Sequence, residues 1–298
     1  MFKPIDVDEH EAEILVRPSM SYWQDAIRRL KKNKIAMVSL GFLVFMVLMC
    51  IFAPYIYPHA YDTQNIDFTN EGPTWNHIFG LDELGRDIFA RIWIGGRVSL
   101  TIGGVGALVS LVVGVIYGGI SGYFGGIVDD IMMRIVEVLV GIPYLIVVII
   151  VSVYLGTGMS ALLIALCITS WTGMARVIRG EILELKESEY VLAAKVLGTS
   201  PMKIILKHLV PNTLSLIIIN TTFAIPGFIF AEAFLSFVGL GIQPPLTSWG
   251  AMAALGQQKM SYYPHELIFP ALALSLTMLA FNLLGDGLRD AFDPKMRQ

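Results

Sequence analysis

The sequence predicts an all-α integral membrane protein with about six transmembrane helices. Of its 298 residues, 55% are hydrophobic and only 15% are charged, and the mean hydropathy is +0.67. A soluble domain of this length cannot bury so many apolar side chains, so lipid must solvate many of them. A helix needs about twenty mostly apolar residues to cross about 30 Å of hydrocarbon, and stretches of that kind recur along the chain.

The first element is the apolar run 35–53, which follows a cluster of basic residues: Arg28, Arg29, Lys31, Lys32 and Lys34. A cleaved signal peptide is the rival interpretation, but the run lacks a small-x-small cleavage pattern. We therefore expect a retained helix after a cytoplasmic segment 1–34, because basic flanks stay inside. We assign region 35–97 to this helix and an external loop after it. The loop contains Arg86, Arg91 and Arg97, which by themselves would favour the cytoplasm, but acidic residues lie among them.

Five further apolar stretches predict the remaining spans, within a core of residues 98–288: 98–121, 131–155, 159–177, 213–240 and 266–288. Gly114, Gly118 and Gly122 recur every four residues in the second span, a spacing that lets another helix approach closely. Pro226 and Gly227 lie within the fifth span and predict a kink or a soft point there. A permeation pathway and ordinary packing can both use such a bend.

Charge and motifs exclude several classes of function. The net charge of -3 gives no reason to expect nucleic acid as a partner. Cys50 and Cys167 lie in apolar runs, so we expect buried small hydrophobes and no disulfide or metal site. The histidines are scattered in loops or in the tail, where solvated or interfacial side chains are expected: His10, His59, His77, His208 and His265. No phosphate loop, HExxH, GxSxG or paired CxxC occurs, so we expect no catalysis.

Residues 178–212 form the most informative loop, and their basic side chains predict a cytoplasmic position, as they do for the tail 289–298. The loop reads as two short helices. Ser188 is a candidate N-cap for the first, which ends at Gly198. Ser200 caps the second, with Pro201 at its first position. Ala193 and Ala194 are small side chains between Leu192 and Val196, a shape that fits a groove of another protein.

The same loop resembles the EAA loop of ABC-importer permeases, the helix that docks on the ATP-hydrolysing subunit. Ala193, Ala194, Gly198 and Pro211 stand at the motif spacing. Leu192 replaces the motif glutamate, and residues 208–210 (HLV) replace Ile-x-Leu. A glutamate occurs earlier, as Glu189 before Tyr190, which is the form of the oligopeptide and dipeptide branch. The resemblance implies these ATPase-coupling residues: Glu189, Tyr190, Ala193, Ala194, Gly198, Pro201 and Pro211.

Two further segments are similar to the C-type subunit of the oligopeptide/dipeptide/nickel permeases: 79–87 (FGLDELGRD) and 231–245 (AEAFLSFVGLGIQPP), the latter followed by Ser248, Trp249 and Gly250. The likeness covers nearly the whole chain and implies a type I ABC-importer permease fold in the cytoplasmic membrane of a prokaryote. It also implies a second permease subunit, two cytoplasmic ATPases that bind ATP and Mg, and an external substrate-binding protein. No cofactor is expected in this chain.

The implied activity is oligopeptide import by alternating access. Uptake of dipeptides, nickel or metal chelates is the alternative within the family, and a self-sufficient channel or ion-coupled carrier, or a membrane scaffold, is the alternative outside it. For the translocation pathway we expect Glu232, Pro226 and Asn220 of the fifth span. An ionisable residue inside a membrane is a functional candidate, although Glu232 can also serve interhelical hydrogen bonding. Arg134 and Glu137 are expected to pair at the cytoplasmic edge.

Overall fold

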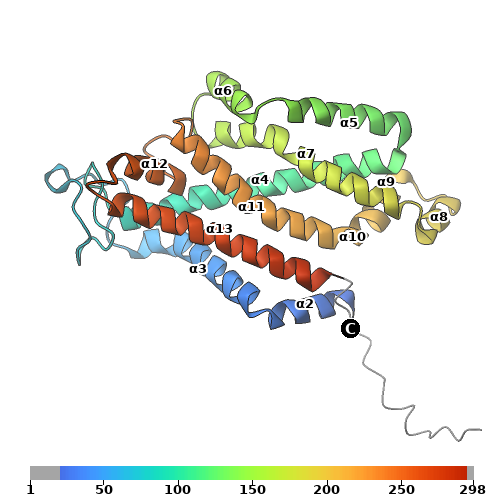
Figure 1. Ribbon diagram of the computed structural model, residues 1–298, viewed down its shortest axis with the longest axis horizontal. Helices are drawn as coiled ribbons and strands as arrows, with labels where there is room; N and C mark the ends of the chain where they lie inside the picture. The colour runs from blue at the N-terminus through green and yellow to red at the C-terminus, as the bar shows by residue number, and fades with distance from the viewer. Residues whose placement is uncertain (1–20, 294–298) are drawn as a thin grey trace, which may run out of the picture.

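The computed structural model describes residues 21–293, which form a bundle of helices without a β-strand in that range (Figure 1). The chain enters with α2 (Tyr22–Lys32), α3 (Lys34–Ile56), the 3-10 turn η1 (Ile66–Phe68) and α4 (Ile88–Phe124). The middle of the chain forms α5 (Gly126–Gly141), α6 (Tyr144–Leu155), α7 (Met159–Leu185), α8 (Glu189–Val196) and α9 (Pro201–Ile204). A π-helical turn η2 (Ile205–Leu209) leads to α10 (Val210–Asn212), α11 (Leu214–Phe237), α12 (Trp249–Lys259) and α13 (His265–Phe292).

Within residues 21–293, five helices are long and apolar enough to cross a membrane, namely α3, α4, α7, α11 and α13. The pair α5 and α6 makes a sixth span if it is taken as one unit, but it is bent by 82°. The span predicted over 131–155 is therefore broken in its middle, and it is not one straight helix. Pro143 has no amide hydrogen to donate and disfavours the helical conformation of Ile142 before it, so the helix ends at Gly141.

Helix α4 begins at Ile88 rather than at residue 98 as the sequence predicted. Asp87 caps its N-terminus, since the Oδ1 atom of Asp87 accepts the amide hydrogen of Ala90 at 2.9 Å. The close approach predicted from the glycine spacing is confirmed between α4 and α7. A Cβ atom on Gly118 would lie 2.3 Å from the carbonyl oxygen of Ala175, and one on Gly114 would lie 2.5 Å from the Cβ of Met174.

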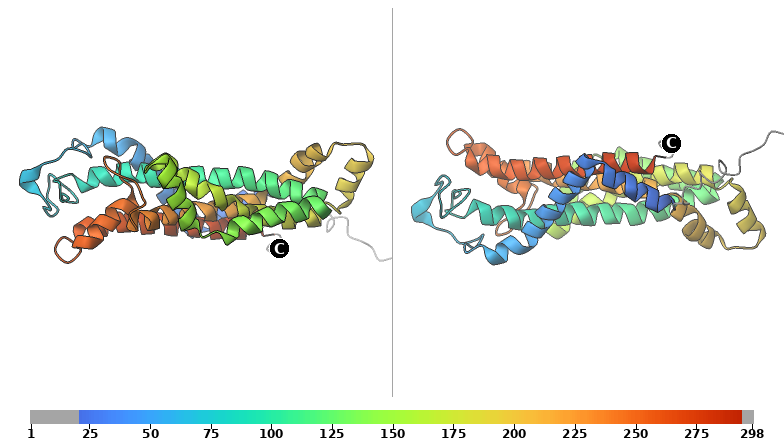
Figure 2. Two further views of the ribbon diagram at one scale, coloured as in Figure 1. Left: turned by 90° about the horizontal axis from the view of Figure 1, so that it is seen from above. Right: turned by 90° about the horizontal axis from the view of Figure 1, so that it is seen from below.

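The functional segments gather at two opposite ends of the elongated bundle (Figures 1 and 2). We call the end formed by residues 57–87 and α12 the loop end, and the other the α8 end. At the loop end, Trp249 is fully buried in a cluster with residues of α3 and α4, including Cys50 and Ile92. At the α8 end, a second apolar cluster joins α4, α7, α8 and the segment 204–209.

Helix α2 lies against the end of α13, where the Trp23 and Phe292 ring centroids are 5.5 Å apart. Cys50 is buried and Cys167 is partly buried, and both are free thiols. The expectations for segment 1–34 and tail 289–298 are only partly covered by the structure. His10, Lys295 and Arg297 fall outside the described residues.

Candidate functional site

Helix α8 has the local geometry that the sequence predicted. Ser188 occupies the predicted N-cap position with an extended backbone, but its side chain accepts no amide hydrogen of α8. Its hydroxyl instead donates to the carbonyl oxygen of Leu185 at 2.5 Å. Gly198 follows the helix at φ +76°, in the left-handed region that favours glycine. Ser200 and Pro201 occupy the N-cap and first positions of α9. The sharp turn between α8 and α9 therefore depends on Gly198.

The two faces of α8 differ in character. Val191 and Ala194 are buried in the apolar cluster of the α8 end, together with Ile178 and Ile182 of α7. On the other side, Val196 is 87% exposed and Leu197 is 84% exposed. Tyr190 and Leu192 are also exposed, as are Glu189 and Ala193. An apolar surface at the tip of a helix that is fixed on its inner face is a candidate docking surface.

The chain between α8 and α11 contains the predicted Pro201 and Pro211. Pro211 lies in α10, directly after the π-helical turn Ile205–Leu209. A π-helical turn is rare and is often found at functional positions. Ile205 and Leu209 of this turn are buried against the residues that hold α8. The helix that carries the docking surface therefore packs, through this turn, against the start of α11.

A cavity of about 270 Å³ lies midway along α4, α6, α7 and α11. Its wall combines small, apolar and hydroxyl side chains: Ser110, Tyr144, Ala165, Leu166, Thr169, Ser170, Ala224, Gly227, Phe228 and Ala231. We call it the hydroxyl cavity. None of the predicted pathway residues Glu232, Pro226 and Asn220 lines it, although Gly227 beside Pro226 does. Pro226 is buried within a helix that continues through it. Asn220 donates from Nδ2 to the Leu216 carbonyl oxygen at 2.8 Å.

Glu232 is fully buried near the loop end of α11. Its Oε1 atom accepts hydrogen bonds from the hydroxyls of Ser248 at 2.5 Å and Ser236 at 2.8 Å, and its Oε2 atom accepts one from Ser99 at 3.2 Å. Ser99 belongs to α4, and Ser248 is the N-cap of α12. The carboxyl group therefore joins three helices by interhelical hydrogen bonds, which is one of the two roles that the sequence left open.

A polar cavity of about 720 Å³ lies between α5 and α7 towards the α8 end, lined by charged residues and one methionine: Asp130, Met133, Arg134, Glu137, Arg176 and Arg179. The predicted pairing of Arg134 with Glu137 is present at 2.7 Å, on the exposed surface. Deeper, Arg179 makes two bonds of 2.5 Å to the carboxylate of Asp129. Ser121 of α4 donates to the same carboxylate, so these contacts join α4, α5 and α7.

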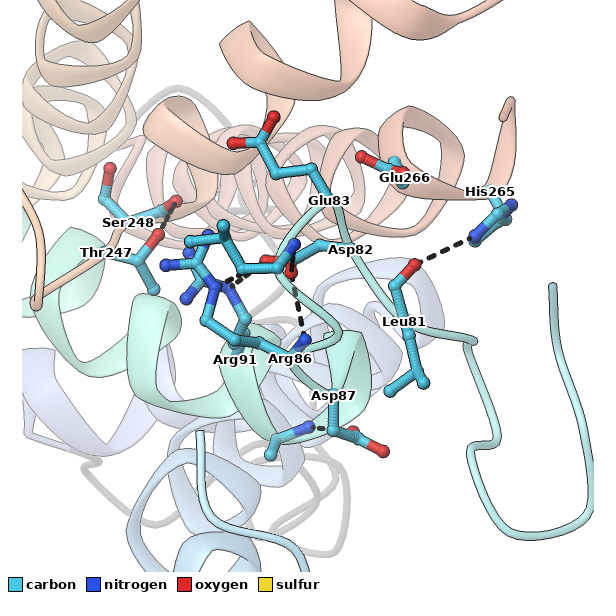
Figure 3. Close-up of polar contacts among 12 residues, drawn as sticks. Leu81, Asp82, Glu83, Arg86, Asp87, Arg91, Thr247, Ser248, His265 and Glu266 are labelled. Atoms are coloured by element: carbon cyan, nitrogen blue, oxygen red, sulfur yellow. Dashed lines mark hydrogen bonds and ion pairs between the residues drawn. The ribbon is translucent and has the colours of Figure 1, made fainter. Parts of the chain in front are cut away.

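Acidic and basic side chains also form a partly buried cluster at the loop end, which was not predicted from the sequence (Figure 3). Arg86 and Arg91 converge on the Oδ2 atom of Asp82, at 2.8 and 3.4 Å. Lys259 of α12 pairs with Glu83 and lies 3.8 Å from Glu266 of α13. The alternation of charges in 82–91, inside an otherwise apolar chain, was the signal available in the sequence.

The basic residues of the predicted external loop are thus engaged inside the protein. Arg86 and Arg91 are 6% and 4% exposed. Arg97 donates to the backbone carbonyl oxygens of Cys50 at 2.5 Å and Ile51 at 2.8 Å, near the end of α3. Nearby, burial and the negative charge of Asp87 raise the pKa of Tyr57 to about 12. Its phenol stays protonated and donates to Asp87 at 3.0 Å.

Comparison with known families decides what kind of protein carries this geometry. The family model described as "Binding-protein-dependent transport system inner membrane component" matches residues 110–298. The chain belongs to this permease family. The model of the N-terminal transmembrane domain of oligopeptide transport permease C matches residues 21–73. Together the two matches identify a C-type permease of the oligopeptide/dipeptide/nickel branch of ABC importers.

Similar proteins cover the permease almost completely. The dipeptide transport system permease protein DppC of Bacillus subtilis is 52% identical over 97% of this chain and 90% of its own length. The oligopeptide transport system permease protein OppC of the same organism is 46% identical over 100% and 98%. The glutathione transport system permease protein GsiD of Escherichia coli O6:K15:H31 is 41% identical over 95% and 94%.

A solved structure supports the fold of the permease. A chain of the MetNI methionine ABC transporter, from a study of its inward-facing conformations, superposes with a TM-score of 0.52 at 20% identity. The match covers 67% of this chain and 94% of that chain. At this level of identity the likeness concerns the fold alone, and it is the type I ABC-importer permease fold.

Proposed function

We propose that this permease forms half of a peptide-import pathway and that α8 couples it to a separate ATPase subunit. The relatives are named for transport of dipeptides, oligopeptides and glutathione, all of which are peptides. A second permease would complete the pathway, two ATPases would bind ATP and Mg, and an external binding protein would deliver the substrate. The permease itself would carry neither ATP nor Mg.

The observation that carries the coupling role is the two-sided character of α8. Its exposed tip offers Tyr190, Leu192, Val196 and Leu197 to a partner. Its inner face packs Val191 and Ala194 against α7 and the turn Ile205–Leu209. Because packed side chains transmit displacement between elements, a partner that moves α8 would also move α7 and the start of α11. Alternating access is the expected outcome of that movement.

The hydroxyl cavity supports the idea of half a pathway. Its volume of about 270 Å³ is close to the roughly 300 Å³ at which pockets begin to enclose small ligands. An oligopeptide is larger than such ligands, so it would need space contributed by a second permease. Ser110, Thr169 and Ser170 could offer hydroxyl groups to the polar peptide backbone on one side of the shared path.

The proposed orientation places the α8 end in the cytoplasm and the loop end outside. The basic residues of α2 and of segment 178–212 support this direction. The arginines of the loop end do not oppose it, because Arg86 and Arg91 are paired within the protein and Arg97 is bonded to α3. Both termini would then be cytoplasmic, and residues 57–87 would face the binding protein.

The coupling role is tested by replacing Gly198 with valine. A β-branched residue is strained at φ +76°, whereas a Cβ atom there meets no atom within 4 Å. The change should therefore disturb the turn after α8 without overpacking the permease. We expect the Gly198→Val complex to insert in the membrane but to lose most of its peptide-stimulated ATP hydrolysis, measured in proteoliposomes with the binding protein present.

Gly180→Val is the matched control, since Gly180 has open space around it and no positive φ. It should retain stimulated hydrolysis. Wild-type stimulation in Gly198→Val would contradict the coupling role of α8. Stimulation of the wild-type complex by a nickel chelate, with none by peptides, would contradict the proposed substrate.

A further inference from the structure

Three side chains that are distant in sequence meet at the loop end. His59 follows the end of α3, His77 lies in the loop, and Asp87 caps α4. Their potential ligand atoms all lie within 4.8 Å of one another. The sequence predicted His59 and His77 as scattered side chains that are solvated or interfacial, but their ring centroids are 4.6 Å apart.

We propose that His59, His77 and Asp87 form a binding site for a divalent transition-metal ion of the zinc and nickel type. Two imidazoles and one carboxylate are a ligand set that zinc, nickel and copper favour, whereas magnesium and calcium prefer oxygen ligands alone. Three protein ligands leave a fourth position for water. No metal site was predicted from the sequence, because His59, His77 and Asp87 do not stand at the spacing of a short metal-binding motif.

Asp87 is held in place before any ion binds. Its Oδ1 atom accepts the Ala90 amide hydrogen at 2.9 Å, and its Oδ2 atom accepts the Tyr57 hydroxyl at 3.0 Å. Figure 3 shows its side chain directed away from Arg86 and Arg91, which bind Asp82 instead. The carboxylate is thus free of a competing guanidinium contact among the residues drawn there. Hydrogen bonds of this kind around a ligand orient it for metal binding.

Binding requires only a small rearrangement. The Nδ1 atom of His77 lies 2.7 Å from the Oδ2 atom of Asp87, at hydrogen-bond distance. Ligand atoms about 2 Å from a tetrahedral ion stand about 3.3 Å apart. The ion would replace the shared proton and move these two atoms about half an ångström farther apart. The His59 nitrogen, within 4.8 Å of the other ligand atoms, would move up to about 1.5 Å closer to complete the site.

The ion is expected to restrict the conformational freedom of the segment that joins α3 to α4. His59 and Asp87 lie at the two ends of this segment, so an ion bound to both would act as a cross-link between its ends. This site does not depend on the coupling role of α8 or on the substrate. Its test is a binding measurement, so its failure is distinct from failure of the proposed function.

The experiment uses the full chain in its complex with the partner subunits, stripped with EDTA and titrated with Zn²⁺. The wild-type complex should bind one more ion per permease than the His59→Ala and His77→Ala complexes. Asp87→Asn should lose the same ion while keeping an oxygen that can cap α4. Tyr57→Phe should weaken binding about tenfold, because it removes a hydrogen bond to a ligand. X-ray absorption of the bound zinc should show imidazole scattering.

His208→Ala is the control, since His208 lies in the turn Ile205–Leu209 at the α8 end, and it should bind Zn²⁺ as the wild type does. Equal zinc content in the wild type, His59→Ala, His77→Ala and Asp87→Asn would overturn the proposal. So would a zinc spectrum without imidazole ligands.

Discussion

At the scale of single residues, Glu232 is buried without an ion pair among its described contacts, which are all hydroxyl groups. Two of these hydroxyls also accept backbone amide hydrogens, since Trp249 donates to Ser99 and Ala251 donates to Ser248. Those donors direct the hydroxyl hydrogens towards the carboxyl group. Glu232 thereby fixes the start of α12 against α4 and α11.

Replacing Glu232 with alanine should destabilise the permease. The change leaves buried hydroxyls without their acceptor, and we expect a loss of about 2 to 3 kcal/mol. Thermal unfolding of the purified complex in detergent would measure it. Glu137→Ala is the matched control, because Glu137 is exposed and its loss should cost about 0.5 kcal/mol or less. Equal effects of the two changes would show that the hydroxyl contacts contribute no stability.

Residue contacts such as these were only partly predictable. The sequence marked Glu232 as a candidate because it lies in an apolar run, but Ser99 is 133 positions away from it, and no local pattern connects the two. The same holds for His59 and His77, which only the folding of the loop brings together. By contrast, Ser188 and Gly198 were predictable, since caps depend on the nearest few residues.

At the scale of elements, the close packing of α4 on α7 depends on glycines of α4, which have no side chain to hold the two helices apart. A Cβ atom on Gly118 would meet the Ala175 carbonyl oxygen at 2.3 Å, which the backbone cannot accommodate without moving. We expect Gly118→Ala to destabilise the permease by about 1 to 3 kcal/mol by forcing the helices apart. Thermal unfolding in detergent would measure the loss.

Gly104→Ala in the same helix is the control, because nothing lies within 4 Å of its Cβ position. It should be neutral or stabilising by up to about 1 kcal/mol, as alanine favours helix over glycine. A stable Gly118→Ala variant would mean that α4 and α7 can separate at little cost.

Hydropathy located the spans well but their limits less well. The start of α4 was missed because Arg91 and Arg97 resemble loop residues until their internal partners are known. The bend between α5 and α6 had a visible signal in Pro143, but the run on both sides is so apolar that hydropathy alone joins it. Composition therefore predicts which residues meet lipid, whereas partners and prolines decide where helices begin and bend.

At the scale of the whole molecule, the two ends of the bundle should lie on opposite sides of the membrane. With Cys50 and Cys167 replaced by alanine, Trp75→Cys at the loop end should react with a membrane-impermeant maleimide in intact cells. Gln24→Cys in α2 should react only after the membrane is opened. Both positions are exposed in the described structure, so the difference would report sidedness, and the reverse pattern would invert the proposed orientation.

The length of helix α4 makes it a useful reference for measuring conformational change during transport. Its 37 residues run without interruption from Ile88 to Phe124, and a helix of that length measures about 55 Å. Spin labels placed near its two ends would have a separation set by the helix itself. The distance between those two labels would serve as a fixed internal reference. A change in the distance from either label to a label on α11 or α13 could then be assigned to movement of α11 or α13.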